Sequence, residues 1–117
     1  MMRLPHLTFY VQKMKPPFVG QARGPVILIR EDARHDKRLW MHEYEHVRQW
    51  YITLGTHGLL YLLIRRYRVW AEARGYAAQC RPDRSDLDAL ATWMAHPVYR
   101  LGMTANECRA EIERYLR

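Results

Sequence analysis

The feature that most constrains this sequence is His42-Glu43-x-x-His46, which lies inside the stretch from Leu39 to Trp50. Two side chains four positions apart face the same direction on an α-helix, where they are about 40° apart around the axis. The spacing therefore predicts a helix on which His42 and His46 can bind one metal ion. Glu43 would lie beside them, where it could accept a proton from a water bound to that ion.

The residues around this motif predict a helix with two different faces. An apolar, buried face is expected from Trp40, Tyr44, Val47, Tyr51 and Leu54. His42 and His46 lie nearly opposite that face. Asp36 is a suitable N-cap and Gly55 a suitable stop, so the helix is expected to end at about residue 54. The alternative interpretation is that both histidines are ordinary residues of a solvated helix surface.

The composition is that of a globular protein. The chain has 117 residues, of which 49% are hydrophobic, with four Trp and eight Tyr. This is enough for one domain with one modest core, expected to span 1–117. The formal charge of +7 permits an anionic partner such as nucleic acid or cell wall. An arginine-rich solvated surface explains the same charge more simply.

The cysteines and the apolar runs indicate the cellular compartment in which the protein is expected. Cys80 and Cys108 do not form a C-x-x-C pair, so a zinc site built from cysteines is not expected. The N-terminal residues lack the long apolar run of a signal peptide, which favours a cytoplasmic protein with both thiols reduced. The most apolar run, Gly58 to Ile64, is too short to span a bilayer, so no membrane span is expected.

The first third of the chain has the pattern of a small sheet. Leu7 to Gln12 alternates apolar and polar residues, and Pro25 to Arg30 is a β-branched, apolar run. Phe18-Val19 could start another strand, and Gly20 to Gly24 has the composition of a turn. We expect these strands to form an antiparallel sheet.

The rest of the chain is predicted to be helical. A second long helix is expected over about 60–80, a third over 86–95 and a fourth over 105–116. Ser85 with Asp88 and Thr104 with Glu107 have the spacing of capping boxes for the last two helices. The predicted fold is α+β: a small N-terminal antiparallel sheet packed on a mainly helical body of about four helices.

A catalytic zinc ion takes three protein ligands, and the motif supplies two. Glu72 is the favoured third ligand because it follows His46 by 26 residues on the next predicted helix. Small residues beside it would let the two helices approach closely. The other candidates for the third ligand are His57, His96, His35 and Asp36.

Further groups would have to support such a site. Tyr76, one turn after Glu72, is a candidate donor to the oxyanion that forms when water attacks a carbonyl, although a structural role would suit it as well. The ligand imidazoles need partners that orient them. Gln49, Asp36 and Gln79 are candidates for this role, and the sequence does not choose among them.

Leu39 to Gln49, followed by Trp70-Ala71-Glu72-Ala73-Arg74, resembles the small zincin-like proteins of bacteria and their phages. The resemblance is to the gluzincin arrangement, which has two histidines and a downstream glutamate. It implies a zinc metallopeptidase with one zinc ion per chain, His42, His46 and Glu72 as ligands and Glu43 as general base. It also implies a bacterial or phage origin and a peptide or protein substrate.

The same resemblance predicts which strand lines the cleft, and this sequence departs from the family pattern at one residue. In zincin-like enzymes an edge strand just before the metal helix often lines the cleft and pairs with the substrate backbone, a role that Val26 to Ile29 could take. The departure is Glu45, a charged residue between the two histidines. On a helical wheel Glu45 faces Arg48, so we expect the two to pair in solvent.

Two other functions compete with hydrolysis. The chain could bind a metal without catalysis and serve as a structural or interaction module. It could instead be a basic nucleic-acid-associated protein or DNA-linked protease, which Arg65, Arg66 and Arg68 favour. The sequence leaves open whether a peptide, a peptidoglycan cross-link or another amide is cut, and it leaves the oligomeric state open.

Overall fold

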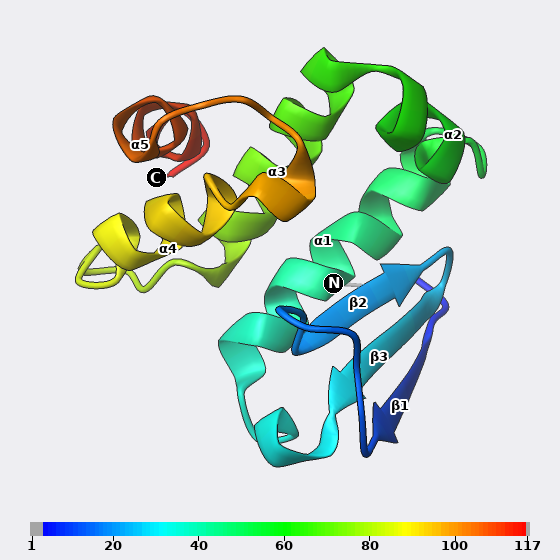
Figure 1. Cartoon of the computed structure of the whole chain (residues 1–117). Helices are drawn as coiled ribbons and strands as arrows, with labels where there is room; N and C mark the ends of the chain where they lie inside the picture. The colour runs from blue at the N-terminus through cyan, green and yellow to red at the C-terminus, as the bar shows by residue number, and fades with distance from the viewer. Residues whose placement is uncertain (1–3, 117) are drawn as a thin grey trace.

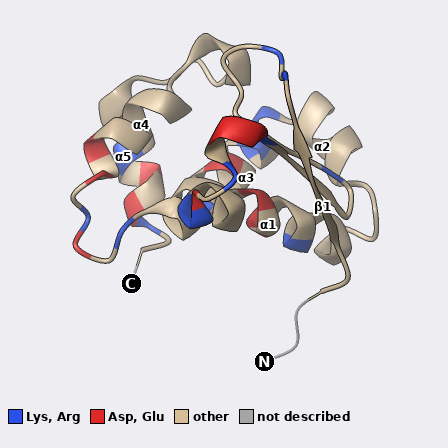
Figure 2. Cartoon of the chain, turned by 90° about the horizontal axis from the view of Figure 1, so that it is seen from below, with Lys and Arg blue, Asp and Glu red and all other residues tan. Residues whose placement is uncertain are grey.

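The computed structural model describes residues 4–116, so residues 1–3 and 117 of the expected domain lie outside the described part. A small sheet formed by the N-terminal third packs against a body of helices (Figure 1). The predicted α+β class is therefore confirmed. Lys, Arg, Asp and Glu are spread over the helices and loops, whereas α2 (His57–Leu63) carries none of them (Figure 2).

The sheet has three strands in the order β1-β3-β2, namely β1 (Leu7–Val11), β3 (Val26–Arg30) and β2 (Gly20–Arg23). β2 is antiparallel to β3, but β1 runs parallel to β3, so the expected antiparallel sheet is wrong for one of its two pairs. The physical reason is the link between β1 and β2, which is long enough to carry the chain across β3 to its other side.

β2 lies where a turn was expected. Its residues have low intrinsic strand preference, but Gly20 to Arg23 pairs in register with the strongly β-forming β3. Gly24, with a φ of +57°, makes the tight connection between them. Pairing with a neighbouring strand thus outweighs local propensity in this segment.

The helix that carries the motif, α1 (Lys37–Ile52), packs on the sheet. Ile27 and Ile29 of β3 are fully buried against Leu39 and Val47 of α1. The Asp36 side chain accepts a hydrogen bond from the Leu39 amide, which confirms the predicted N-cap. A short 3₁₀ turn, η1 (Glu31–Ala33), leads from the sheet into the helix.

The helical body contains more helices than expected. The helix predicted over 60–80 is two helices, α2 and α3 (Arg65–Gln79), because the backbone at Ile64 is extended, with φ −118° and ψ 107°. Together with α4 (Leu87–Met94) and α5 (Ala105–Glu113), five α-helices follow the sheet within residues 4–116, where about four were expected. A second 3₁₀ turn, η2 (Pro97–Tyr99), connects α4 to α5.

Of the two predicted capping boxes, one is present. Thr104 and Glu107 bond reciprocally at the start of α5. The predicted capping box of Ser85 and Asp88 is absent. Asp86 holds the N-cap position of α4 and makes no capping bond there. Its carboxylate instead accepts a hydrogen bond from the Arg81 amide.

The core of the helical body lies between α3, α4 and α5. Cys108, Ile112 and Met94 are fully buried there. Both cysteines are free thiols and are buried, in agreement with the expected reduced state. Within residues 4–116, none of the helices is both long enough and apolar enough to cross a membrane.

Candidate metal centre

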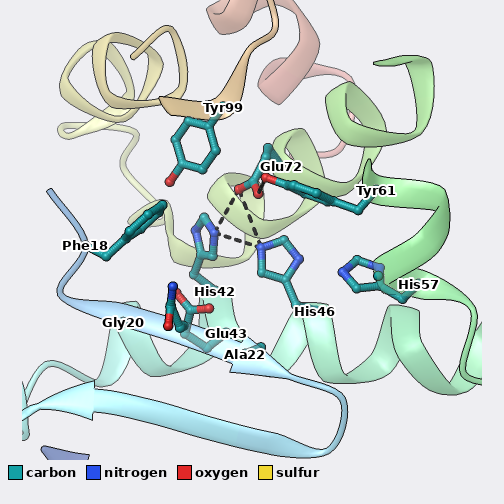
Figure 3. A pocket seen from close by; sticks show the side chains of 12 residues that line it. Phe18, Gly20, Ala22, His42, Glu43, His46, His57, Tyr61, Glu72 and Tyr99 are labelled. Atoms are coloured by element: carbon teal, nitrogen blue, oxygen red, sulfur yellow. Dashed lines mark hydrogen bonds and ion pairs between the residues drawn. The ribbon is translucent and has the colours of Figure 1, made fainter. Parts of the chain in front are cut away.

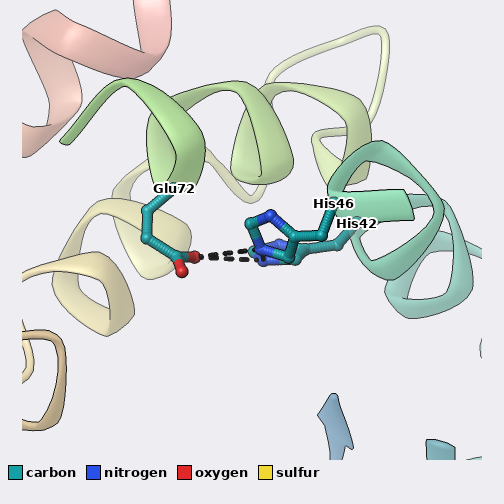
Figure 4. A group of neighbouring side chains, drawn as sticks. All are labelled: His42, His46 and Glu72. Carbon is teal, nitrogen blue, oxygen red and sulfur yellow. Dashed lines mark hydrogen bonds and ion pairs between the residues drawn. The ribbon is translucent and has the colours of Figure 1, made fainter. Parts of the chain in front are cut away.

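Three side chains from α1 and α3 meet at one buried point between the helices (Figure 3). The Nε2 atoms of His42 and His46 are 3.2 Å apart. Oε1 of Glu72 lies 3.3 Å from the first and 3.5 Å from the second. Figure 4 shows the carboxylate of Glu72 facing both rings from the opposite helix. The favoured third ligand therefore joins the two histidines in space.

The separations among these atoms match the requirements of a tetrahedral ion. Zinc–ligand distances of about 2.0–2.1 Å place tetrahedral ligand atoms roughly 3.3 Å from one another. The three observed separations lie between 3.2 and 3.5 Å. Two imidazole nitrogens and one carboxylate oxygen also form a donor set that zinc accepts, with one position left over. The residues present therefore fit the metal that the sequence predicts.

Close packing of α1 on α3 makes this convergence possible. Ala71 and Ala73 are fully buried on α3. At Gly75 a β-carbon would lie only 2.8 Å from Nε2 of His42, so any other residue there would collide with the imidazole. Sequence reasoning recognised that small residues lie near Glu72 but gave Gly75 no specific role.

Each ligand imidazole is held by a glutamine on its other nitrogen. Nδ1 of His42 lies 2.9 Å from Oε1 of Gln79, and Nδ1 of His46 lies 3.0 Å from Oε1 of Gln49. An amide oxygen only accepts, so each Nδ1 donates and each Nε2 keeps its lone pair toward the metal position. Two of the three candidate orienting residues thus have this contact, whereas Asp36 caps α1 instead.

The electrostatics of the three groups are strongly coupled. Burial lowers the pKa of His46, but the nearby Glu72 carboxylate outweighs it and raises the pKa to about 10. Burial likewise raises the pKa of Glu72, and the two imidazoles overcome this and lower it below its ordinary range. Without a metal ion between them, the pair of His46 and Glu72 would hold a proton at neutral pH. A metal must therefore displace that proton when it binds.

Glu43 is buried beside the candidate ligands, yet its carboxylate forms no hydrogen bond or ion pair within residues 4–116. It lines the cavity next to the histidines. Burial raises its pKa, against the smaller lowering effect of His42 and His46. Gly20 of β2 lies so close that a β-carbon there would be 3.1 Å from Oε2 of Glu43. The acid is thus confined but remains free to exchange a proton.

Glu45 differs from the sequence expectation. It pairs with Arg48 as predicted, through two hydrogen bonds of 2.8 and 2.7 Å, but it is only 9% exposed. The expected pairing in solvent is therefore wrong. Arg74 of α3 also reaches Glu45, at 3.3 Å. This residue helps to join α1 to α3.

A cavity of about 230 Å³ opens in front of the candidate ligands. One wall is the edge strand β2, and the others come from α2 and from the turn at Tyr99 (Figure 3). Val26 to Ile29 forms the central strand, so it does not take the role expected for an edge strand beside the cleft. β2, which was expected to be a turn, occupies that place.

Three tyrosines surround the site. The hydroxyl of Tyr76 is bonded to that of Tyr99 at 2.8 Å, and the ring of Tyr76 packs edge-on against His42. Tyr99 lines the cavity in front of the ligands, whereas Tyr76 lines an adjoining cavity of about 140 Å³. The hydroxyl of Tyr61 donates to Oε2 of Glu72 at 2.5 Å.

Sequence reasoning missed Tyr61 and Tyr99. The available signal for Tyr61 was that it is the only polar side chain in the aliphatic run from residue 59 to 64. No comparable signal marked Tyr99, because it reaches the site only through the folding of the segment after α4.

The other candidate ligands have different positions. Nδ1 of His57 bonds the hydroxyl of Tyr67 at 2.6 Å, and its ring forms part of the cavity wall, 5.7 Å from the ring of His46. His96 accepts a hydrogen bond from the Val98 amide at the start of η2. His35 is exposed in the turn before α1. None of these three residues belongs to the ligand group found among residues 4–116.

The arrangement combines three convergent ligand atoms, an adjacent unpaired acid and a cavity wide enough for part of a substrate. Such a set can hold an ion, deprotonate a water and accept a carbonyl group. Comparisons with family models, curated proteins and solved structures found no match to this chain.

Proposed function

We propose that the protein is a zinc-dependent hydrolase that cuts a peptide or another amide bond. His42, His46 and Glu72 would hold the ion, and Glu43 would act as general base. The observation that carries this proposal is the convergence of the three ligand atoms, 3.2 to 3.5 Å apart, beside a buried acid that faces the same cavity.

When bound, zinc would lower the pKa of a water molecule and polarise the substrate carbonyl. Glu43 would accept the proton of that water and later deliver it to the leaving amine. Its raised pKa suits both transfers, since a base that is too weak releases its proton before the amine can take it. Gly20 leaves just enough space for this carboxylate against β2.

The tyrosine pair would supply the donor for the developing oxyanion. Tyr76 and Tyr99 share one hydrogen bond between their hydroxyls, which uses one of their two hydrogens. Tyr99 lines the cavity, so it would donate the free hydrogen to the substrate while Tyr76 polarises it from behind. The role expected for Tyr76 would therefore be indirect. Tyr61 already donates to Glu72 and would orient that ligand.

A substrate in extended conformation suits the cavity. β2 is an edge strand, and Gly20, Gln21 and Ala22 line the cavity wall. Backbone groups on such an edge can pair with a peptide by strand addition, and the small residues Gly20 and Ala22 leave room for it. The substrate would therefore be a segment of unfolded or flexible polypeptide.

The test is hydrolysis of fluorescence-quenched peptide libraries by zinc-loaded protein. We expect cleavage that a chelator abolishes and added zinc restores, with no cleavage by Glu72→Ala. Zinc binding without any cleavage would instead favour the inactive metal-binding module. Cleavage that survives complete removal of the metal would contradict the proposal.

The nucleic-acid alternative loses part of its support. Arg68 is buried and donates hydrogen bonds to four backbone carbonyls, among them those of Tyr61 and Tyr99. It helps to tie α3 to its neighbours and is not part of a basic surface. Of the expected basic cluster, only Arg65 and Arg66 are exposed.

A further inference from the structure

The exposed aliphatic side chains of this protein are concentrated in one short segment. Leu54 is 91% exposed, and Ile52 and Ile64 are about half exposed, at 55% and 46%. On α2, Leu59, Leu62 and Leu63 are 59%, 57% and 68% exposed. The segment from residue 52 to 64 lies at one corner of the molecule, away from the C-terminal helices (Figure 1). We call these six side chains the α2 patch.

The three leucines of α2 lie on one side of the helix. Their spacing of three and four residues places them within about 100° around its axis. The opposite side of the same helix is part of the cavity wall, through His57 and Tyr61. The α2 patch is therefore the outer surface of a helix whose inner surface faces the candidate site.

The charged residues next to the α2 patch in the sequence are all basic. No Asp or Glu occurs between Glu45 and Glu72, whereas Arg65 and Arg66 follow the patch directly and are exposed. Within residues 4–116, neither of these arginines forms an ion pair, although one N–H of Arg65 donates to the Leu101 carbonyl. Arg65 also interacts electrostatically with Glu107, so Arg66 is the less constrained of the two cations. Exposed aliphatic side chains beside such a cation are the features that bind a protein to the surface of an anionic membrane.

A second copy of the chain fits the α2 patch less well. Symmetric pairing through this small patch would bring the arginines of both copies together, and like charges at an interface oppose association. We therefore propose that the α2 patch docks on an anionic lipid surface, with the leucines in the interfacial layer and Arg65 and Arg66 beside the headgroups.

Docking would place α2 between the lipid surface and the cavity, so the candidate site would lie one helix diameter, ~10 Å, from the membrane. If the proposed hydrolysis is correct, the substrates would then be polypeptide segments held at a membrane. Docking itself does not depend on catalysis, and Glu43→Gln should bind vesicles as the wild type does. Failure of docking and failure of hydrolysis can therefore be distinguished.

The experiment is co-sedimentation of the purified full chain with phosphatidylcholine vesicles, prepared with and without phosphatidylglycerol. We expect binding at low salt that requires phosphatidylglycerol and weakens as salt is added. Leu62→Glu should reduce binding at least tenfold, whereas Leu7→Glu, at a site of similar exposure on β1, should not reduce it. Arg66→Gln should weaken binding about fivefold, and Lys13→Gln, also at an exposed position, far less.

Several results would overturn the proposal. One is the absence of vesicle binding at low salt. Another is equal loss of binding in Leu62→Glu and Leu7→Glu, which would mean that net charge alone controls it. A third is a wild-type dimer, measured by light scattering, that Leu62→Glu dissociates while neither protein binds vesicles.

Discussion

Two glutamates on one turn of α1, Glu43 and Glu45, are both buried but have opposite surroundings. Glu45 accepts hydrogen bonds from Arg48, Gln49 and Arg74. Burial raises its pKa, but these partners, Arg48 above all, lower it below its ordinary value. Glu43 has no such partner within residues 4–116, and burial leaves its pKa raised.

The difference separates a structural acid, Glu45, from the acid that we propose as general base, Glu43. A buried carboxylate that is fully paired stays ionised and links the elements that hold it. A buried carboxylate without partners costs stability, and such costs persist at sites that need the group for chemistry. One side of α1 therefore joins the helix to α3, while the neighbouring side carries the candidate base.

The largest expected effect is on catalysis. Glu43→Gln should reduce hydrolysis roughly 10²–10⁴-fold, as expected for loss of a general base. It should keep its zinc and should not lower Tm, since Glu43 forms no hydrogen bond or ion pair within residues 4–116 that the substitution would break. The measurements are cleavage rate, zinc content and thermal unfolding.

Glu45→Gln is the matched control and should show the reverse. It leaves Arg48 and Arg74 without their carboxylate, which should cost about 1–3 kcal/mol of stability while the cleavage rate per folded molecule stays unchanged. Equal loss of activity in both variants, with no difference in Tm, would remove the distinction between the two acids.

The next largest effect is on zinc affinity, which depends on how closely α3 approaches the candidate ligand His42. Gly75→Ala places a methyl group 2.8 Å from Nε2 of His42 and should displace that imidazole. We expect zinc affinity to fall on the order of 100-fold, by analogy with other changes that disturb ligand orientation. Competition with a fluorescent zinc chelator measures it.

Gly58→Ala provides the comparison, because nothing lies within 4 Å of a β-carbon at that helical position. Its zinc affinity should match the wild type, and its stability should rise slightly from the better helix propensity of alanine. Unchanged zinc affinity in Gly75→Ala would argue against a ligand role for His42.

Gln49 and Gln79 test whether the side of α1 that carries the candidate ligands is coupled to the side that carries Glu45. Gln79 contacts His42, whereas Gln49 accepts from His46 and donates to both Glu45 and the Ala71 carbonyl. Gln79→Met and Gln49→Met should each lower zinc affinity about 10–100-fold. Only Gln49→Met should also lower the Tm of the metal-free protein, because it removes the buried hydrogen bonds to Glu45 and to the Ala71 carbonyl of α3. Identical unfolding curves for both variants would show that Gln49 does not couple the two sides.

The smallest effect is the pH dependence of the metal-free protein. The pKa of His46 is raised from 6.5 to about 10, so its contribution to stability is complete below pH 6.5 and disappears as pH rises toward 10. On the acid side, the pKa of His57 is lowered by burial to about 4, and that of Glu72 is also lowered. Both of these contributions disappear as pH falls, so stability should be greatest near pH 6.5.

Zinc should remove the loss of stability at alkaline pH, because it takes the place of the proton on His46. We expect Tm of the zinc-loaded protein to stay level between pH 6.5 and about 9 while that of chelator-treated protein falls. Calorimetry in buffers of different ionisation enthalpy should detect release of about one proton per zinc at pH 8. Parallel Tm curves and no proton release would contradict the coupling of His46 to Glu72.

The parts of the site that follow from local spacing could be predicted. The helical position of His42, Glu43 and His46 depends only on residues close in sequence, and so do the Asp36 cap and the Thr104 box. Glu72 was within reach because small residues around it indicated a close helix pair.

The missed features depend on contacts between distant residues. The parallel pairing of β1 with β3, the burial of Glu45 under Arg74 and the contact of Gly75 with His42 all join separate elements. The break at Ile64 was hidden because the aliphatic run continues through it without glycine or proline. It is this break that lets α2 turn Tyr61 toward Glu72.

The most direct test of the account is the metal content of purified protein, measured by elemental analysis after dialysis against metal-free buffer. The account predicts about one zinc per chain in the wild type and in Glu43→Gln, and little zinc in Glu72→Ala. Equal zinc in wild type and Glu72→Ala, or no metal in any of the three proteins, would contradict it.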